Sequence, residues 1–148
     1  MSAAHGYSGT PLPRKLGLKD GQAVAFIGLP AELGHLADAA SFQEVAHYPD
    51  AGAVPAGRRR YDLAHLFVTR RRDLERGLEA LGPAIRPDGA IWVSWPKRAS
   101  KMPTDITEDT IREVCLPRGL VDVKVCAVDA VWSGLKLVWR KELRAALG

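Results

Sequence analysis

Apolar and polar positions change along the chain in a way that predicts strands and helices in turn. Ala23–Ile27 is a continuous apolar run, which is typical of a strand buried on both faces of a parallel sheet. Residues 31–40 then carry apolar side chains at helical spacing. Residues 42–47 are predicted as a second strand. Residues 49–60 contain several Pro, Gly and Arg residues and are predicted as a loop.

The pattern is clearer in the second half of the chain. Residues 61–68 (YDLAHLFV) form the next predicted buried strand, and leucines at 74, 78 and 81 then mark one stripe of a helix. Gly82-Pro83 is expected to kink or break that helix, because proline lacks a backbone N–H donor. After a turn at Asp88-Gly89, residues 90–95 (AIWVSW) predict another strand.

Three further elements complete the pattern. A helix is predicted to begin near Asp105 or Thr107, either of which can cap it, and to end at Pro117 and Gly119. Residues 121–125 alternate strictly between apolar and polar, which indicates a strand with one solvated face near a sheet edge. Residues 135–137 alternate in the same way, and the short connection between these strands requires an antiparallel pair.

Two segments resemble the class I S-adenosylmethionine-dependent methyltransferases: LGLKDGQAVAFIG (16–28) and AIRPDGAIWVSW (84–95). A closer resemblance is to a family of short bacterial proteins classified as a domain of unknown function. It rests on YSGTPLPRKLG (7–17), on an LFVT strand end, on a WPK segment and on VDVKVCAVDAVWSGLKLV (121–138). This resemblance implies a small methyltransferase-like fold without an established activity.

Together these observations predict one α/β domain over residues 1–148, in which residues 1–12 are an irregular N-terminal segment. The expected architecture is a Rossmann-like three-layer sandwich, a shortened class I methyltransferase-like fold. Its sheet is mostly parallel, with a C-terminal antiparallel strand. Ligands bind such sheets outside the carboxyl ends of the strands, near the point where the strand order reverses. That rule selects a set of candidate ligand-binding residues: Gly28, Thr69, Arg70, Lys97, Arg98, Ser100, Asp129 and Trp132.

The loop after the first strand departs from the methyltransferase pattern. Methyltransferases carry roughly G-x-G-x-G there, whereas in this chain only Gly28 matches, and Leu29 and Pro30 add bulk. The acidic residue expected after the second strand, to bind ribose hydroxyls, has Asp50 as a stand-in. On these grounds S-adenosylmethionine is disfavoured as a cofactor, although the fold would allow it. We therefore expect a non-catalytic ligand-binding or interaction module; the alternative is a divergent methyltransferase or another small-molecule enzyme.

The segment 95–101 (WPKRASK) is the strongest candidate site. It joins an aromatic side chain, three cations and a hydroxyl at the end of a strand, a combination that can hold a small anionic ligand. The alternative interpretation is an exposed basic loop. Asp129 could pair with Lys97, or could instead bond to nearby backbone N–H groups in a turn where Gly134 supplies a positive φ. Trp132 is expected to pack on the N-terminal segment around Tyr7.

Other residues that often carry chemistry give weaker signals. The four histidines share no metal-ligand spacing, so no metal site is predicted. His65 lies within a predicted strand and is interpreted as a hydrogen-bonded core residue. Cys126 lies in mid-strand, where a free cysteine acts as a small hydrophobic residue.

Charge and hydropathy narrow the list of partners. The net charge is +4, but the arginine clusters 58–60 and 70–72 lie at opposite ends of one strand, so they cannot form one phosphate-binding surface. We therefore expect no nucleic-acid binding. No apolar run approaches the roughly 20 residues needed to cross a bilayer, and the N-terminus has no apolar signal segment. We expect a cytoplasmic protein with no membrane association.

Overall fold

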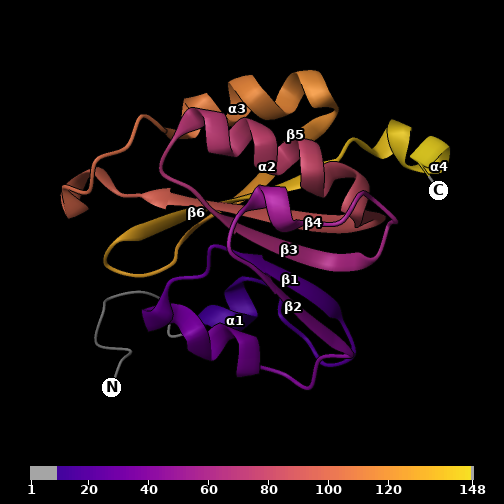
Figure 1. Ribbon diagram of the computed structural model, residues 1–148, viewed down its shortest axis with the longest axis horizontal. Helices are drawn as coiled ribbons and strands as arrows, with labels where there is room; N and C mark the ends of the chain where they lie inside the picture. Colours follow the sequence, from indigo (N-terminus) through magenta and orange to yellow (C-terminus); the bar gives the residue numbers. More distant parts are fainter. Residues whose placement is uncertain (1–9, 148) are drawn as a thin grey trace.

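A computed structural model describes residues 10–147 of the chain and contains one six-stranded sheet (Figure 1). The strand order is β2-β1-β3-β4-β6-β5. The first four strands along the sheet run parallel, and β6 is antiparallel to both of its neighbours. The strands are β1 (Ala23–Ile27), β2 (Glu44–Tyr48), β3 (Tyr61–Phe67), β4 (Ile85–Pro96), β5 (Leu120–Ala127) and β6 (Trp132–Trp139). The predicted α/β fold class, with its C-terminal antiparallel strand, is confirmed.

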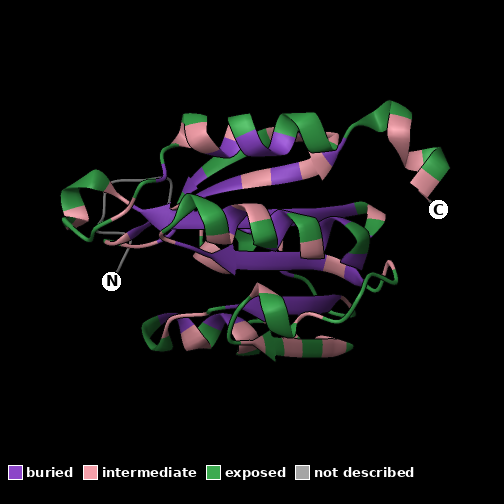
Figure 2. Ribbon diagram, turned by 45° about the horizontal axis from the view of Figure 1, so that its top comes forward, coloured by how far each residue is buried: buried purple, intermediate pink, exposed green. Residues whose placement is uncertain are grey.

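Helices cover the sheet on both sides and make three layers. On one face lie α2 (Arg71–Ala84) and α3 (Glu108–Cys115); on the other lie α1 (Leu12–Lys15) and the 3-10 helix η2 (Ala31–Asp38) (Figure 1). Figure 2 shows central strands that are buried along most of their length and helices whose outer faces are exposed. The remaining short helices lie in connections or near the C-terminus: η3 (Ala51–Ala53), η4 (Arg98–Ser100), η5 (Leu116–Arg118), η6 (Lys141–Leu143) and α4 (Arg144–Leu147).

The core consists of two apolar clusters, one on each face of the sheet. Strand β3 contributes to both, because successive side chains of a strand point to opposite faces. Leu66 packs with the leucines of α2, whereas Phe67 packs with Trp92 and the helices of the other face. The buried indole of Trp92 donates from Nε1 to the carbonyl oxygen of Leu16 at 2.8 Å, which ties the end of α1 to the sheet.

The predicted break at Gly82-Pro83 is wrong, because α2 continues through Pro83 to Ala84. The proline falls in the last turn, so little helix remains for it to disrupt. Arg59 closes this end. Its backbone N–H donates to the carbonyl oxygen of Pro83 at 3.0 Å, and its Nη1 donates to that of Gly82 at 2.8 Å. Arg59 has a φ of 50°, so its backbone is left-handed where it meets the helix end.

Two further boundaries differ from the sequence-based prediction. Strand β4 begins at Ile85 rather than after a turn at Asp88-Gly89, and the residues before Ala90 form an irregularity in its pairing with β3. Trp132 is the first residue of β6 and does not lie in the hairpin turn. Gly134 also lies within β6 and does not have a positive φ. A Cβ at that position would lie 3.2 Å from the Trp92 ring, so close packing is the constraint there.

The segment between β2 and β3 is short. A full methyltransferase fold would have another strand and helix here, but residues 49–60 form only η3 and a loop. Strand β2 therefore forms one edge of the sheet within residues 10–147, and its residues alternate between half-buried and exposed (Figure 2).

Candidate functional site: a cavity at the carboxyl ends of β1, β2 and β3

The parallel part of the sheet has its topological switch point at β1, which has β2 on one side and β3 on the other. The chain passes from β1 to β2 on one side and then returns past β1 to β3 on the other side, so the strand order reverses at β1. A crevice for ligands forms at such a point in parallel sheets. A cavity of about 580 Å³ lies there, within the size range of small-molecule sites. It is lined by Ile27, Gly28, Pro49, Asp50, Ala51, Gly52, Leu66, Phe67, Val68, Thr69, Asp73, Arg76 and Trp132.

Gly28 brings bare backbone to the floor of this cavity. Its φ is +71°, and its N–H donates to the carbonyl oxygen of Tyr48 at 2.8 Å. A Cβ added at this position would lie 3.2 Å from the carbonyl oxygen of Phe67. Both the backbone conformation and the space therefore favour glycine, and a ligand can approach the main chain directly.

Charged groups stand on two walls. On one wall lies Asp50, an exposed residue whose Oδ1 accepts a hydrogen bond from the N–H of Gly52 at 2.9 Å. On the other wall, Asp73 and Arg76 project from the first turns of α2. Within residues 10–147 the guanidinium of Arg76 makes no ion pair. The cavity thus offers both signs of charge to a ligand.

An aromatic group forms the apolar side of the cavity. Phe67 and Trp132 meet edge to face, with ring centroids 5.3 Å apart. Phe67 also stacks on His65 at 4.2 Å. The structure thus shows Phe67 as a packing partner of Trp132; the predicted partner, Tyr7, lies outside the described residues.

His65 is a core residue, as its position in a strand predicted. It is buried, and its Nε2 lies 2.6 Å from Ser94 Oγ. Burial lowers the pKa of His65 to about 3, because the imidazolium would lose its hydration. The ring is therefore neutral at ordinary pH, and it is sealed beneath Phe67 rather than exposed to the cavity.

The structure brings some of the candidate residues together and separates others. Gly28, Thr69 and Trp132 line the main cavity. Arg98 lines a second cavity of about 380 Å³ at the end of β4, together with Trp95, Lys101 and Met102. One hydrogen bond joins the walls of the two cavities: Thr104 Oγ1, in the wall of the second, donates to the carbonyl oxygen of Thr69, in the wall of the first, at 2.7 Å.

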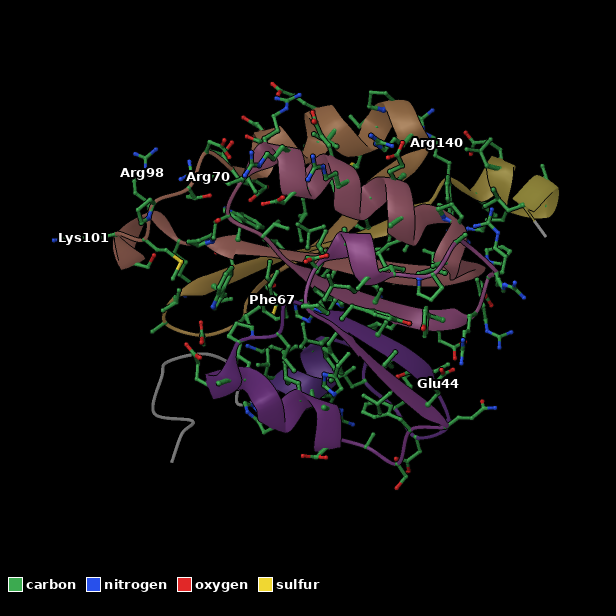
Figure 3. The ribbon with its side chains drawn as sticks, in the orientation of Figure 1. Glu44, Phe67, Arg70, Arg98, Lys101 and Arg140 are labelled. Carbon is green, nitrogen blue, oxygen red and sulfur yellow. The ribbon has the colours of Figure 1, made fainter. Side chains whose placement is uncertain are left out.

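The remaining candidates line neither of these cavities. Ser100 Oγ donates to the carbonyl oxygen of Lys97 at 2.7 Å in a local turn. Asp129 Oδ1 accepts from the N–H groups of Val131 and Trp132 at 2.8 and 2.7 Å, which is the turn alternative considered for this residue. Figure 3 shows Arg70, Arg98 and Lys101 projecting from the same end of the sheet. Within residues 10–147 none of these three side chains forms an ion pair.

Sequence reasoning missed Asp73 and Arg76. A signal for them existed, because the first turns of a helix that follows a parallel strand lie over the carboxyl end of that strand. Asp50, the expected stand-in for the acidic residue after the second strand, lies in the cavity wall. No group of three or more His, Cys, Asp or Glu residues within residues 10–147 could hold a metal ion. No helix of that part of the chain is long and apolar enough to cross a membrane.

No protein-family model matches the chain, and no curated protein is similar enough in sequence to match it. Solved structures do match in fold. An S-adenosylmethionine-dependent methyltransferase from Aquifex aeolicus matches with a TM-score of 0.61 and 16% identity, over 84% of this chain and 85% of that one. The chain has a methyltransferase-like fold. The resemblance to the bacterial family of unknown function stays a prediction.

Two further matches bear on the cofactor. Magnesium protoporphyrin IX methyltransferase from Synechocystis PCC 6803, solved with bound S-adenosylmethionine, matches with a TM-score of 0.63 and 12% identity, over 86% of this chain and 74% of that one. Phosphoethanolamine N-methyltransferase 2 from Haemonchus contortus, in complex with S-adenosyl-L-methionine, matches with a TM-score of 0.65 and 11% identity, over 88% of this chain and 51% of that one. The expectation that S-adenosylmethionine is disfavoured is therefore wrong. That expectation depended on the missing glycines of one loop and not on the fold as a whole.

Proposed function

We propose that the chain binds S-adenosylmethionine in the cavity between β1 and β3 and acts as a divergent methyltransferase. One observation carries the proposal: the cavity lies where the strand order reverses, and Gly28 exposes backbone on its floor. The volume of about 580 Å³ suits a nucleoside-sized ligand. The bulk of Leu29 and Pro30 does not close it, because neither residue lines the cavity.

The lining residues suggest a division of roles. Asp50 would accept hydrogen bonds from ribose hydroxyls, as a carboxylate after the second strand is suited to do. Arg76 and Asp73 would hold the carboxylate and the ammonium group of the methionine portion by charge-assisted hydrogen bonds. Phe67 and Trp132 would contact apolar parts of the ligand. When bound, S-adenosylmethionine supplies an electrophilic methyl group for a nucleophilic acceptor.

The acceptor site would lie on the same edge of the sheet, in the second cavity. Arg98 and Lys101 border that cavity, and Arg70 projects from the same end of the sheet (Figure 3). These cations favour a small acidic acceptor, as the basic segment 95–101 suggested. Trp95 and Met102 would contact its apolar portion.

Binding of S-adenosylhomocysteine, measured by calorimetry, tests the first step. We expect Asp50→Asn to weaken binding about tenfold, which corresponds to the loss of roughly one charge-assisted hydrogen bond. The asparagine keeps the Oδ1 that accepts from Gly52, so the turn should survive. Glu79→Gln, which removes an exposed carboxylate of α2 outside the cavity, is the matched control and should bind normally. Failure of the wild-type protein to bind at millimolar ligand would refute the proposal.

A non-catalytic ligand-binding module is the second candidate. Pro30 favours it, since it has no N–H to donate and stands at the start of η2, immediately after the cavity floor. This candidate predicts cofactor binding without methyl transfer to any acidic acceptor. A screen of acceptors with a methyl-labelled cofactor distinguishes the two.

A further inference from the structure

A second feature lies away from this edge, on the face of the sheet that carries α1. Four cations gather there over β5 and β6: Arg14, Lys19, Lys124 and Lys136. Lys124 and Lys136 are direct cross-strand partners, and Lys136 is in turn the partner of Trp92. Because directly paired side chains share a face, both lysines lie on the side where Trp92 meets α1. Lys124 Nζ reaches the carbonyl oxygen of Lys15, 3.3 Å away. We call this group the lysine face.

A groove of about 590 Å³ runs between the lysine face and the start of the described chain. It is lined by Thr10, Arg14, Lys15, Lys124, Val125, Cys126 and Ala127. None of these residues is acidic, and residues 1–9 contain no Asp or Glu either. The ion pairs within residues 10–147 involve none of the four cations that define the lysine face.

The opposite face of the same strands is arranged differently. There Arg112 of α3 pairs with Asp122 of β5 at 3.0 Å and also with Glu108 and Asp109. The charges of this group are therefore paired within the fold. Those of the lysine face are not, although β5 and β6 supply both faces.

This arrangement opposes folding. Like charges directly opposite each other in an antiparallel pair are destabilising, and Lys124 and Lys136 are such a pair. Burial, together with the charges of Lys124 and Lys19, lowers the pKa of Lys136. An anion in the groove, beside Lys124, would reduce this repulsion, and the reduction would favour binding.

We propose that the groove beside the lysine face binds a small molecule that carries two or more phosphate groups. Arg14 and Lys124 of the lysine face line the groove, and Lys136 lies directly opposite Lys124; such a set of cations suits clustered phosphates better than a single carboxylate. A bounded groove of this volume fits a small molecule. Among residues 10–147 no aromatic side chain lines it, so that part of the chain provides no stacking platform of the kind that single-stranded nucleic acids use. The site is separate from the cavity between β1 and β3 and does not depend on the function proposed for that cavity.

Inorganic tripolyphosphate is the probe, because it carries clustered phosphates and nothing else. We expect it to raise the melting temperature of the wild-type protein and to bind measurably by calorimetry, with an affinity that falls as salt is added. Lys124→Gln should weaken binding about tenfold, since it removes one charge-assisted contact. Without the probe, the same variant should be as stable as the wild type or more so, because the repulsion from Lys136 is removed.

Two control variants test where tripolyphosphate binds. Lys141→Gln removes an exposed cation elsewhere on the surface and should leave binding unchanged. Lys101→Gln removes a cation from the edge where the second cavity lies; loss of tripolyphosphate binding in this variant, with retention in Lys124→Gln, would overturn the assignment. Absence of binding to the wild type would overturn it as well. Tighter binding of a single-stranded RNA than of tripolyphosphate or a nucleoside triphosphate would replace the small-molecule ligand by a nucleic acid.

Discussion

The Nε2 atom of His65 lies 2.6 Å from Ser94 Oγ in the middle of the sheet, on neighbouring strands β3 and β4. Tyrosine and tryptophan aside, these are the two polar side chains that are fully buried within residues 10–147. The pair lies beneath the aromatic wall of the cavity, since His65 stacks on Phe67. Substitutions in this pair should therefore change the stability of the core rather than the binding of a ligand.

The first prediction concerns pH. The folded-state pKa of His65 is about 3, below the ordinary value of 6.5, so the unfolded chain binds a proton that the folded chain does not between these values. The contribution of His65 to stability is complete above pH 6.5 and is lost as the pH falls toward 3, by roughly 1 kcal/mol per pH unit. Urea unfolding across this range should show a shallower pH slope in His65→Asn than in the wild type. If the free energy of unfolding had the same pH slope in both proteins, the lowered pKa of His65 would be contradicted.

The second prediction concerns the partner of His65. Ser94→Ala leaves a buried ring nitrogen without its hydrogen bond, and the free energy of unfolding should fall by about 1–3 kcal/mol. Ser133→Ala is the control, because Ser133 is half-buried in the neighbouring strand and its hydroxyl bonds to no residue within 10–147. If the two variants were equally stable, the buried pair would contribute nothing.

The third prediction concerns the contact between α2 and β3. A Cβ at Gly77 would lie 2.4 Å from Cδ2 of Leu66, which is buried beneath the helix. Gly77→Ala should therefore destabilise by about 1–3 kcal/mol through overpacking, despite alanine's better helix propensity. Gly34→Ala in η2 meets nothing within 4 Å and should be neutral or slightly stabilising. Thermal unfolding compares them, and a Gly77→Ala protein as stable as Gly34→Ala would show that the helix can shift outward.

The fourth prediction concerns the turn before β6. Asp129→Ala removes the acceptor for two backbone N–H groups, and we expect a loss of about 1–2 kcal/mol in unfolding free energy. Asp129→Asn keeps Oδ1 and should remain close to the wild type. A different result, in which Asp129→Ala is stable but no longer binds an acidic acceptor, would favour a direct role in ligand binding.

Local patterns along the sequence were sufficient to predict the strands and their order of appearance. The apolar runs of β1, β3 and β4 mark buried strands, and β5 is the predicted edge strand. The expected burial of one β5 face is wrong, because the register shifts between Asp122 and Lys124, and Val123 and Val125 are exposed. The termination of α2 was not predictable in the same way. It depends on Arg59, which lies far from Pro83 in the sequence and supplies donors to the helix end.

The site was predicted only in outline. The rule about carboxyl ends selected Gly28, Thr69 and Trp132, which the structure gathers around one cavity. The rule could not predict that Arg76 lines the cavity whereas Lys97 does not, because the direction of a long side chain depends on packing that the sequence does not state. The lysine face was missed for a related reason: Lys124 and Lys136 become partners only through the register of β5 and β6.

Asp50 follows an edge strand, and this has a consequence for how the cavity fluctuates. Strand β2 bonds only to β1 within residues 10–147, so its amides can separate from the sheet without disturbing β3 or β4. The wall that carries Asp50 should open with it. Amide hydrogen exchange in β2 should therefore be fast in the free protein and slow markedly when a ligand occupies the cavity, while the already protected central strands barely respond.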